Sequence, residues 1–169
     1  MAQSSNSSSL FDRVILGNLK KARVALVFTE WNDLIVSEQL IGCKRILNEF
    51  DAQVIVSNAV PGSFELPFAC KKTWESFSLK PIEEQPEAII AFGAVIRGGT
   101  PHFEYVSKAV TDGITQLNLM LPIPTVFGVL TVDNENQAWE RLGGIHGHKG
   151  EEAALTALKM IHFCRENAK

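Results

Sequence analysis

His102 is the residue whose type and setting most directly favour chemistry. It follows the segment Gly98-Gly99-Thr100-Pro101, which separates a short apolar run at residues 88–92 from a region of helical periodicity. We expect Thr100 to cap this helix and Pro101 to occupy its first turn. The N–H groups and positive dipole of such a helix start favour an anion, and histidine exchanges protons near neutral pH. The arrangement predicts chemistry on a phosphorylated small molecule, and a purely local hydrogen-bonding role for His102 is the alternative.

The elements that position this histidine follow from the hydrophobic pattern. Apolar runs typical of buried strands lie at residues 23–29, 54–56, 88–92 and 125–131. Between them, apolar residues recur every three or four positions, which predicts amphipathic helices. We expect helices from the Asn32-Asp33 cap to about residue 50, over about 65–77, from 101 to the prolines at 122 and 124, and after 150 to near 167. A short helix capped by Asp133 or Asn134 is expected to end near Leu142, before a glycine-rich loop over 143–150.

Strands that alternate with helices predict an α/β fold, a three-layer α/β/α sandwich with a central, parallel, flavodoxin-like sheet of four strands. Ligands bind beyond the carboxyl ends of the strands in such folds. The loops expected at that end span residues 29–33, 59–65, 97–102 and 131–134. They place an aromatic ring, a carboxylate, a base and an anion-binding loop at one end of the sheet, in Trp31, Glu65, Arg97, Thr100 and His102, and Phe127 lies in the strand before the fourth loop. Trp31 is expected to be a half-exposed stacking surface or an ordinary core residue.

Composition limits the class of protein. The 169 residues suffice for one domain with a sizeable core, and 46% are hydrophobic and 21% charged. The net charge of −3 provides no basic face for nucleic acid. No apolar run approaches the roughly 20 residues that cross a bilayer, so no membrane association is expected. The three cysteines are far apart and form no CxxC pair, which favours reduced thiols in a cytoplasmic protein.

The chain divides into a tail and a domain. Residues 1–9 are rich in serine and lack the apolar core of a signal peptide, so we expect a disordered tail. Residues 10–169 contain no linker and no internal repeat, which predicts a single domain. Near its start, the apolar cluster Val14-Ile15-Leu16 predicts a peripheral strand.

Several familiar binding motifs are missing from the sequence. No GxGxxG follows the first strand, and the segment 143–150 lacks the glycine before Lys149 and the Ser/Thr after it that a P-loop requires. The first loop of a flavodoxin would be rich in Ser/Thr and Gly, where this chain has Trp31. His146 and His148 have acidic neighbours, but the spacing is loose for a set of metal ligands. We therefore expect no dinucleotide site and no metal site.

Four segments, in one collinear order, resemble the lumazine synthase family. They are residues 60–67 (VPGSFELP), residues 93–105 (GAVIRGGTPHFEY), residues 127–131 (FGVLT) with Asn134 and Gln137-Ala138, and residues 147–150 (GHKG). The resemblance runs from about Arg23 to Met160, which is nearly the whole chain. It implies a transferase of riboflavin biosynthesis that uses neither a cofactor nor a metal. The implied reaction condenses 5-amino-6-(D-ribitylamino)uracil with 3,4-dihydroxy-2-butanone 4-phosphate to 6,7-dimethyl-8-ribityllumazine, with release of phosphate and water.

The resemblance also implies roles for individual residues. His102 corresponds to the catalytic histidine of the family. The phosphate would bind at Gly99 and Thr100, where Arg141 of a neighbouring subunit would grip it and Lys149 of the adjacent chain would lie nearby. The pyrimidine ring would stack on Trp31, and the pyrimidine and ribityl pocket would be lined by Ser63, Phe64, Glu65, Ala94, Val95, Ile96 and Phe127.

Three positions depart from the family pattern. Trp31 stands where a phenylalanine is common, Gly99 replaces an acidic or small residue, and Ile145 replaces a lysine. The wider ring of Trp31 leads to the hypothesis that flavin-like ligands bind more tightly. The other two changes alter the loop and the charge around the phosphate.

The resemblance implies a homo-oligomer as well. Family members form pentamers with each active site between two chains, and many assemble into a 60-subunit shell that can enclose riboflavin synthase. The segment Val14-Ile15-Leu16 would then extend a neighbour's sheet, and the absence of an insertion in residues 143–150 favours the shell. The alternatives are a flavin-binding carrier and a shell-forming structural protein on the same scaffold.

Overall fold

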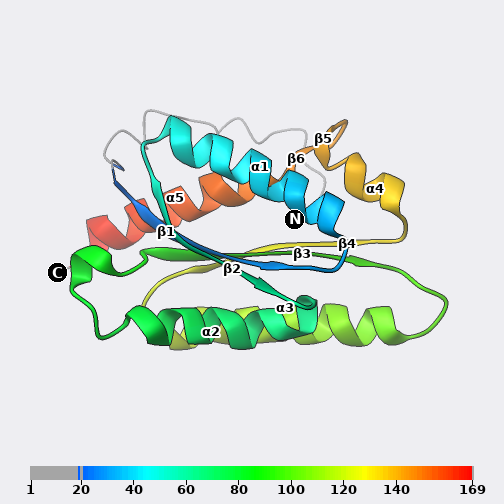
Figure 1. The fold of residues 1–169 in the computed structure, drawn as a ribbon, viewed down its shortest axis with the longest axis horizontal. Coiled ribbons are helices and arrows are strands. Elements are labelled where there is room, and N and C mark those ends of the chain that lie inside the picture. Colours follow the sequence, from blue (N-terminus) through cyan, green and yellow to red (C-terminus); the bar gives the residue numbers. More distant parts are fainter. Residues whose placement is uncertain (1–18, 20, 169) are drawn as a thin grey trace.

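Four parallel strands form the centre of the molecule, and their order in the sheet is β2-β1-β3-β4 (Figure 1). The computed structural model describes residue 19 and residues 21–168. The strands are β1 (Arg23–Thr29), β2 (Gln53–Val60), β3 (Ala88–Ile96) and β4 (Thr125–Val132). All three pairings between neighbouring strands are parallel, which confirms the predicted sheet.

Helices cover both faces of this sheet, as the alternation of elements predicts. In Figure 1, α1 (Asp33–Glu49) and α5 (Lys149–Asn167) lie on one face, and α2 (Leu66–Phe77) and α3 (His102–Met120) lie on the other. The short helix α4 (Glu135–Trp139) follows β4, and single 3-10 turns, η2 (Ser63–Glu65) and η3 (Ile82–Glu84), precede α2 and β3. The three-layer sandwich is therefore confirmed.

The core has two halves because successive side chains of a strand point to opposite faces. In β1, Val24 and Leu26 pack with residues of α1 and α5, whereas Ala25 and Val27 pack with residues of α2 and α3. The whole of β1 from Val24 to Val27 is buried. Each fully buried valine or leucine contributes about 1.5–3 kcal/mol to stability, so this strand cannot shift register without a large cost.

One of the three predicted helix caps is wrong, and a second is correct in position but lacks a side-chain hydrogen bond. Pro101 occupies the cap position of α3, with no side-chain cap bond, so the expectation for Thr100 is wrong. The helix begins at His102, one residue later than a cap at Thr100 would place its start. Asn32 precedes α1 in a left-handed conformation with φ 61°, but it makes no side-chain cap bond. Asn134 caps α4 as expected, and its side chain accepts a hydrogen bond from the N–H of Gln137 at 3.0 Å.

Several elements are longer than the sequence indicates. Strands β2 and β3 continue to Val60 and Ile96, because each pairs along its length with a neighbouring strand. The glycine-rich segment contains an antiparallel hairpin, β5 (Leu142–Gly144) and β6 (Gly147–His148), and α5 already begins at Lys149. The Ser-rich tail and Val14-Ile15-Leu16 lie outside the described residues. Within the described part of the chain, no helix combines the length and the apolar character that crossing a bilayer requires.

Candidate active site

The first two loops at the carboxyl end of the sheet meet at Gly62. The N–H of Trp31 donates to the carbonyl of Pro61 at 3.2 Å, which joins the loop after β1 to the loop after β2. A Cβ atom at Gly62 would lie 3.7 Å from Trp31 Cδ1 and 3.2 Å from Glu65 Oε2. The side chain of Trp31 is 72% exposed, so it is a surface ring and not a core residue. An accessible aromatic face and a carboxylate therefore flank one glycine, as a planar polar ligand requires.

The second and third loops are in close contact at the end of β3. Ser63 is buried, and a Cβ atom on Gly93 would lie 2.8 Å from its hydroxyl oxygen, so only glycine fits there without a shift. The side-chain amide of Asn32 donates to the carbonyl of Ala94 at 2.8 Å and ties the first loop to the same strand. Other members of the predicted pocket on these elements are Phe64, which is exposed, and the half-buried Val95 and Ile96.

The backbone of the loop between β3 and α3 is accessible to ligands. Gly98 and Gly99 are exposed, and a Cβ atom at either would meet nothing within 4 Å. Thr100 is also exposed, and His102 is the first residue of α3, a helix of 19 residues. An anion can reach the start of this helix without displacing a side chain at the two glycines, and the helix dipole favours it there.

Arg97 links this loop to two carboxylates. Its Nε atom donates to Asp133 Oδ1 at 2.7 Å, and its Nη1 atom donates to Glu104 Oε1. The hydrogen bonds that Arg97 donates to Asp133 and Glu104 hold the pKa of Arg97 above its ordinary value. The same guanidinium lowers the pKa of Glu104, chiefly through its hydrogen bond. The exposed loop is therefore anchored by ionised groups.

A second group of predicted residues lies elsewhere on the protomer, beside β4. Phe127, Arg141 and Lys149 line a groove of about 640 Å³ on this outer strand. Arg141 donates from Nη1 to the carbonyl of Gln137 at 2.9 Å, and Lys149 Nζ pairs with Glu152 at 2.7 Å. The groove thus combines an aromatic ring with two cations, which suits a planar, negatively charged ligand. Trp31, Glu65 and His102 are not among the residues that line this groove.

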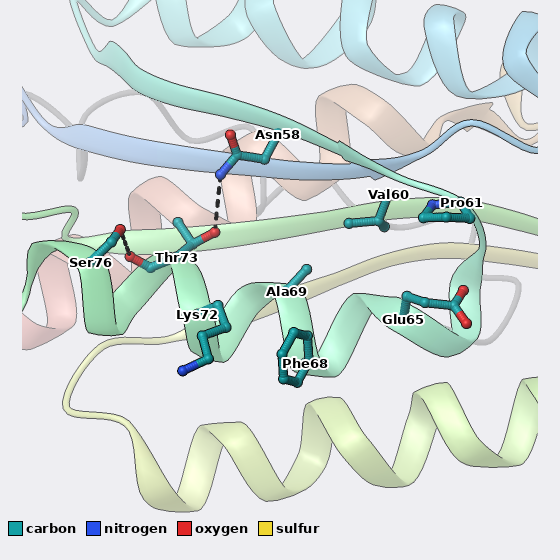
Figure 2. A pocket seen from close by; sticks show the side chains of 9 residues that line it. All are labelled: Asn58, Val60, Pro61, Glu65, Phe68, Ala69, Lys72, Thr73 and Ser76. Atoms are coloured by element: carbon teal, nitrogen blue, oxygen red, sulfur yellow. Dashed lines mark hydrogen bonds between the residues drawn. The ribbon is translucent and has the colours of Figure 1, made fainter.

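A smaller pocket borders the site at the opposite edge of the sheet. Figure 2 shows it between β2 and α2, with Glu65 and Pro61 at one end and Ser76 at the other. Its volume is about 430 Å³, and the amide of Asn58 donates to the hydroxyl of Thr73 at 3.3 Å. Because β2 is the other outer strand of the sheet, this pocket lies along a strand edge that no other strand of the described residues pairs with.

The sequence did not predict the contacts that two residues make at the site. Asn32 was expected only to cap α1, but it bonds to β3, and its left-handed backbone was the available signal because asparagine tolerates that conformation. Gln137 receives the N–H of Asp133 on its side chain at 2.9 Å and the guanidinium of Arg141 on its carbonyl. In residue 19 and residues 21–168, no group of three or more His, Cys, Asp or Glu residues is placed to hold a metal ion.

Comparisons with known proteins give a consistent result. Residues 21–165 match the family model described as 6,7-dimethyl-8-ribityllumazine synthase. Proteins of that name from three bacteria are similar to this chain. The protein of Parabacteroides distasonis is 41% identical over 165 residues, covering 96% of this chain and 99% of its own length. That of Christiangramia forsetii is 42% identical over 171 residues, covering 100% and 98%.

The third relative, from Porphyromonas gingivalis, is 44% identical over 143 residues, covering 83% of this chain and 84% of its own length. The matches therefore extend over almost all of both chains, and they include every element that carries the carboxyl-end loops and the groove beside β4. The chain belongs to the 6,7-dimethyl-8-ribityllumazine synthase family.

Proposed function

We infer that the protein condenses 5-amino-6-(D-ribitylamino)uracil with 3,4-dihydroxy-2-butanone 4-phosphate to 6,7-dimethyl-8-ribityllumazine, the penultimate step of riboflavin biosynthesis. It is a transferase of that pathway. The family match carries this inference, and one structural observation supports it. The exposed indole of Trp31 and the carboxylate of Glu65 flank Gly62 at the same end of the sheet as the open loop before His102. The planar ring of one substrate and the phosphate of the other can thus bind at separate positions at this end of the sheet.

The pyrimidine is assigned to the surface formed by the first three loops. Its ring stacks on Trp31, and its polar edge faces the segment of Ser63, Phe64 and Glu65. The ribityl chain then extends along the end of β3, past Ala94, Val95 and Ile96. The support for this placement is that Asn32 and Ser63 hold these loops against the same strand.

The phosphate of the second substrate is assigned to the loop before α3. The backbone at Gly99 and Thr100 binds it, and His102 lies at the start of the same helix. In the reaction, the amine of the pyrimidine attacks the ketone and water leaves as the imine forms. Phosphate is then eliminated, and the ribitylamino nitrogen attacks the remaining carbonyl, so that the ring closes with loss of a second water. Each step moves a proton, and His102 accepts and returns it.

Much of the rate comes from holding two substrates together, because this removes the entropic cost of their encounter.

The proposed assembly is supported by the presence of Phe127, Arg141 and Lys149 in a groove that Trp31, Glu65 and His102 do not line. We propose that Phe127, Arg141 and Lys149 of one copy complete the carboxyl-end loops of the next in a ring of five. Twelve such rings are proposed to form a 60-subunit shell able to enclose riboflavin synthase. The outer edge of β2, with the pocket of Figure 2 beside it, is proposed to receive the segment Val14-Ile15-Leu16 of a neighbour as an added strand.

The cytoplasm is the proposed location, because Cys43, Cys70 and Cys164 are free thiols in the structure. A carrier that binds flavin without catalysis, and a structural shell protein, are the rival functions. Neither function requires the proton-transfer group of His102 or a cation that binds a phosphate. The presence of His102 and Arg141 favours the enzyme.

The experiment that tests the function mixes the two substrates with the purified protein and follows the absorbance of the lumazine product. Turnover is expected with the unmodified chain, and its absence under conditions where both substrates bind would leave only the rival functions. His102→Ala should slow turnover about 10²- to 10⁴-fold while pyrimidine binding changes little. Arg141→Ala should mainly raise the KM of the butanone phosphate.

A mixture of the two variants tests whether each site lies between two chains. When His102→Ala and Arg141→Ala chains are unfolded, mixed equally and refolded together, about a quarter of the sites in a random ring contain both intact residues. Activity is then expected to exceed the sum of the separately refolded variants. Activity equal to that sum would show that both residues act within one chain.

A further inference from the structure

Arg97 joins three segments that surround the open loop. Its backbone N–H donates to the carbonyl of Val132 at 2.9 Å, so the residue is held by the end of the β3–β4 pairing. Its side chain bonds to Asp133 at 2.7 Å and to Glu104 in the first turn of α3. The guanidinium also lies over the ring of Phe103, 4.1 Å from its centroid. The side chain of Arg97, whose backbone is held by β4, therefore contacts the two residues that follow His102 in α3.

The loop that Arg97 spans has little packing of its own. Residues 98–101 are all exposed, and the space around the two glycines is open. Two glycines in sequence lose more conformational freedom on ordering than other residues would. A loop of this kind needs an external restraint to present its N–H groups and the following histidine in one arrangement. The ion pair between Arg97 and Glu104 joins the two ends of the segment that contains the exposed N–H groups and His102.

The second contact of Arg97 leads to Arg141. Asp133 accepts from Arg97 with its side chain and donates its N–H to the side chain of Gln137 at 2.9 Å. The carbonyl of Gln137 in turn accepts from Arg141 at 2.9 Å. Gln137, in the middle of α4, thus connects Asp133, the partner of Arg97, with Arg141. The two groups assigned to phosphate are connected through this series of hydrogen bonds.

We propose that Arg97 is a positioning residue, which holds the phosphate-binding loop and His102 at one end of its contacts and α4 with Arg141 at the other. The inference rests on the proposed function. Arg97 is not the ligand of the phosphate, because two carboxylates already surround its single charge and engage its Nε and Nη1 atoms. A guanidinium presents donors from several nitrogens in one rigid plane, a geometry that the single nitrogen of an ammonium group does not reproduce.

The experiment measures steady-state kinetics and the binding of inorganic phosphate for Arg97→Ala, Arg97→Lys and Asp133→Asn. Lys108→Ala is the matched control, since Lys108 forms an exposed ion pair with Asp112 on the same helix at 2.6 Å. We expect Arg97→Ala to raise the KM of the butanone phosphate about tenfold and to weaken inorganic phosphate, with the KM of the pyrimidine within about twofold. Because the contacts are exposed, its thermal midpoint should match that of the control.

Asp133→Asn distinguishes positioning from direct binding. If Arg97 bound the phosphate itself, loss of the neighbouring negative charge would strengthen phosphate binding. The positioning role requires weaker binding, and it requires the double variant Arg97→Ala/Asp133→Asn to be no worse than Arg97→Ala alone. Arg97→Lys should behave like Arg97→Ala. Full activity in Arg97→Lys, stronger phosphate binding in Asp133→Asn, or equal KM changes for both substrates would each overturn the inference.

These outcomes are separable from a failure of the proposed function. An unmodified chain that forms no lumazine would contradict the function, whatever the variants do. An active unmodified chain whose Arg97→Ala variant behaves like Lys108→Ala would contradict only the positioning role.

Discussion

The backbone N–H of Lys149 donates to the carbonyl of Arg141 at 2.8 Å, so the two cations of the β4 groove are joined through the main chain. The hairpin β5–β6 lies between them and pairs Leu142 with His148. A change in this hairpin therefore displaces both cations together. The groups that restrain Arg141 and Lys149 are therefore expected to affect phosphate binding.

Replacement of Glu152 is expected to improve phosphate binding. Both carboxylate oxygens of Glu152 accept from Lys149, at 2.9 and 2.7 Å, and this contact competes with an incoming phosphate. Glu152→Gln removes the negative charge at nearly constant volume. The KM of the butanone phosphate should fall by about two- to fivefold at low ionic strength, and the effect should shrink as salt is added.

Glu151→Gln is the control for this prediction, because Glu151 pairs with Arg45 of α1 and not with Lys149. Its kinetic constants are expected to stay unchanged. A rise of KM in Glu152→Gln would mean that Glu152 orients Lys149 for the substrate, and would contradict the competition.

Gly42→Ala is expected to destabilise the fold. The ring of His148 occupies the place that a Cβ atom at Gly42 would take, so α1 and the start of α5 cannot keep their present separation. Overpacking of this kind costs about 1–3 kcal/mol. The midpoint of urea unfolding, measured at one fixed protein concentration, should therefore fall.

Gly98→Ala is the matched control, since its new methyl group meets open space and should change stability by less than about 0.5 kcal/mol. His148→Ala should remove most of the extra cost of Gly42→Ala, so the two changes should be strongly non-additive. Additive changes in the free energy of unfolding would show that the ring is not the obstacle.

Glu87 should make stability depend on pH in the acid range. Burial acts to raise the pKa of Glu87, but hydrogen bonds from Arg165 and from the N–H of Arg23 outweigh it and lower the pKa. In the unfolded chain the pKa of a glutamate is about 4.3, so the stabilisation from ionised Glu87 is fully present above that pH. It is lost as the pH falls through the lower value of the folded protein.

Glu87→Gln should cost about 1–3 kcal/mol at pH 7, and the difference from the unmodified protein should shrink as the solution is acidified. Urea unfolding at a series of pH values measures this. Glu83→Gln, an exposed position in η3, is expected to follow the unmodified protein. A difference for Glu87→Gln that stays constant from pH 7 to pH 3 would contradict the linkage.

Cys43 and Cys70 should not react with thiol reagents in the folded protein. Burial raises the pKa of each thiol to about 12, so at pH 8 only about one molecule in ten thousand carries the thiolate. Both side chains are also inaccessible. Mass spectrometry after treatment with iodoacetamide should find the label on Cys164 before either of them, and on all three cysteines in urea. Labelling of Cys43 or Cys70 at the rate of Cys164 would contradict the prediction.

The order of the elements could be predicted from the sequence because periodicity is a local property. The run from Val24 to Phe28 predicts a buried strand without any knowledge of its partners, and β1 is found there. The loops at the carboxyl ends followed from that order, since a parallel sheet places all four at one edge. The cap of α4 at Asn134 was equally local, because the side chain and the N–H that it binds are three residues apart.

The extents of the strands and the grouping of the site residues required the tertiary structure. Strand β3 continues past Gly93 because β4 pairs with it as far as Val132, a contact between residues far apart in the chain. Asn32 bonds to Ala94 and Arg97 to Asp133 for the same reason, and no local pattern marks either contact. The sequence by itself determined which side chains stand at the ends of the strands. Only the packing of distant segments decided that Phe127, Arg141 and Lys149 share a groove on the outer strand. The same packing brings Trp31 to Gly62 and Glu65. The reason is that the distances between these side chains depend on long-range pairing and not on spacing along the chain.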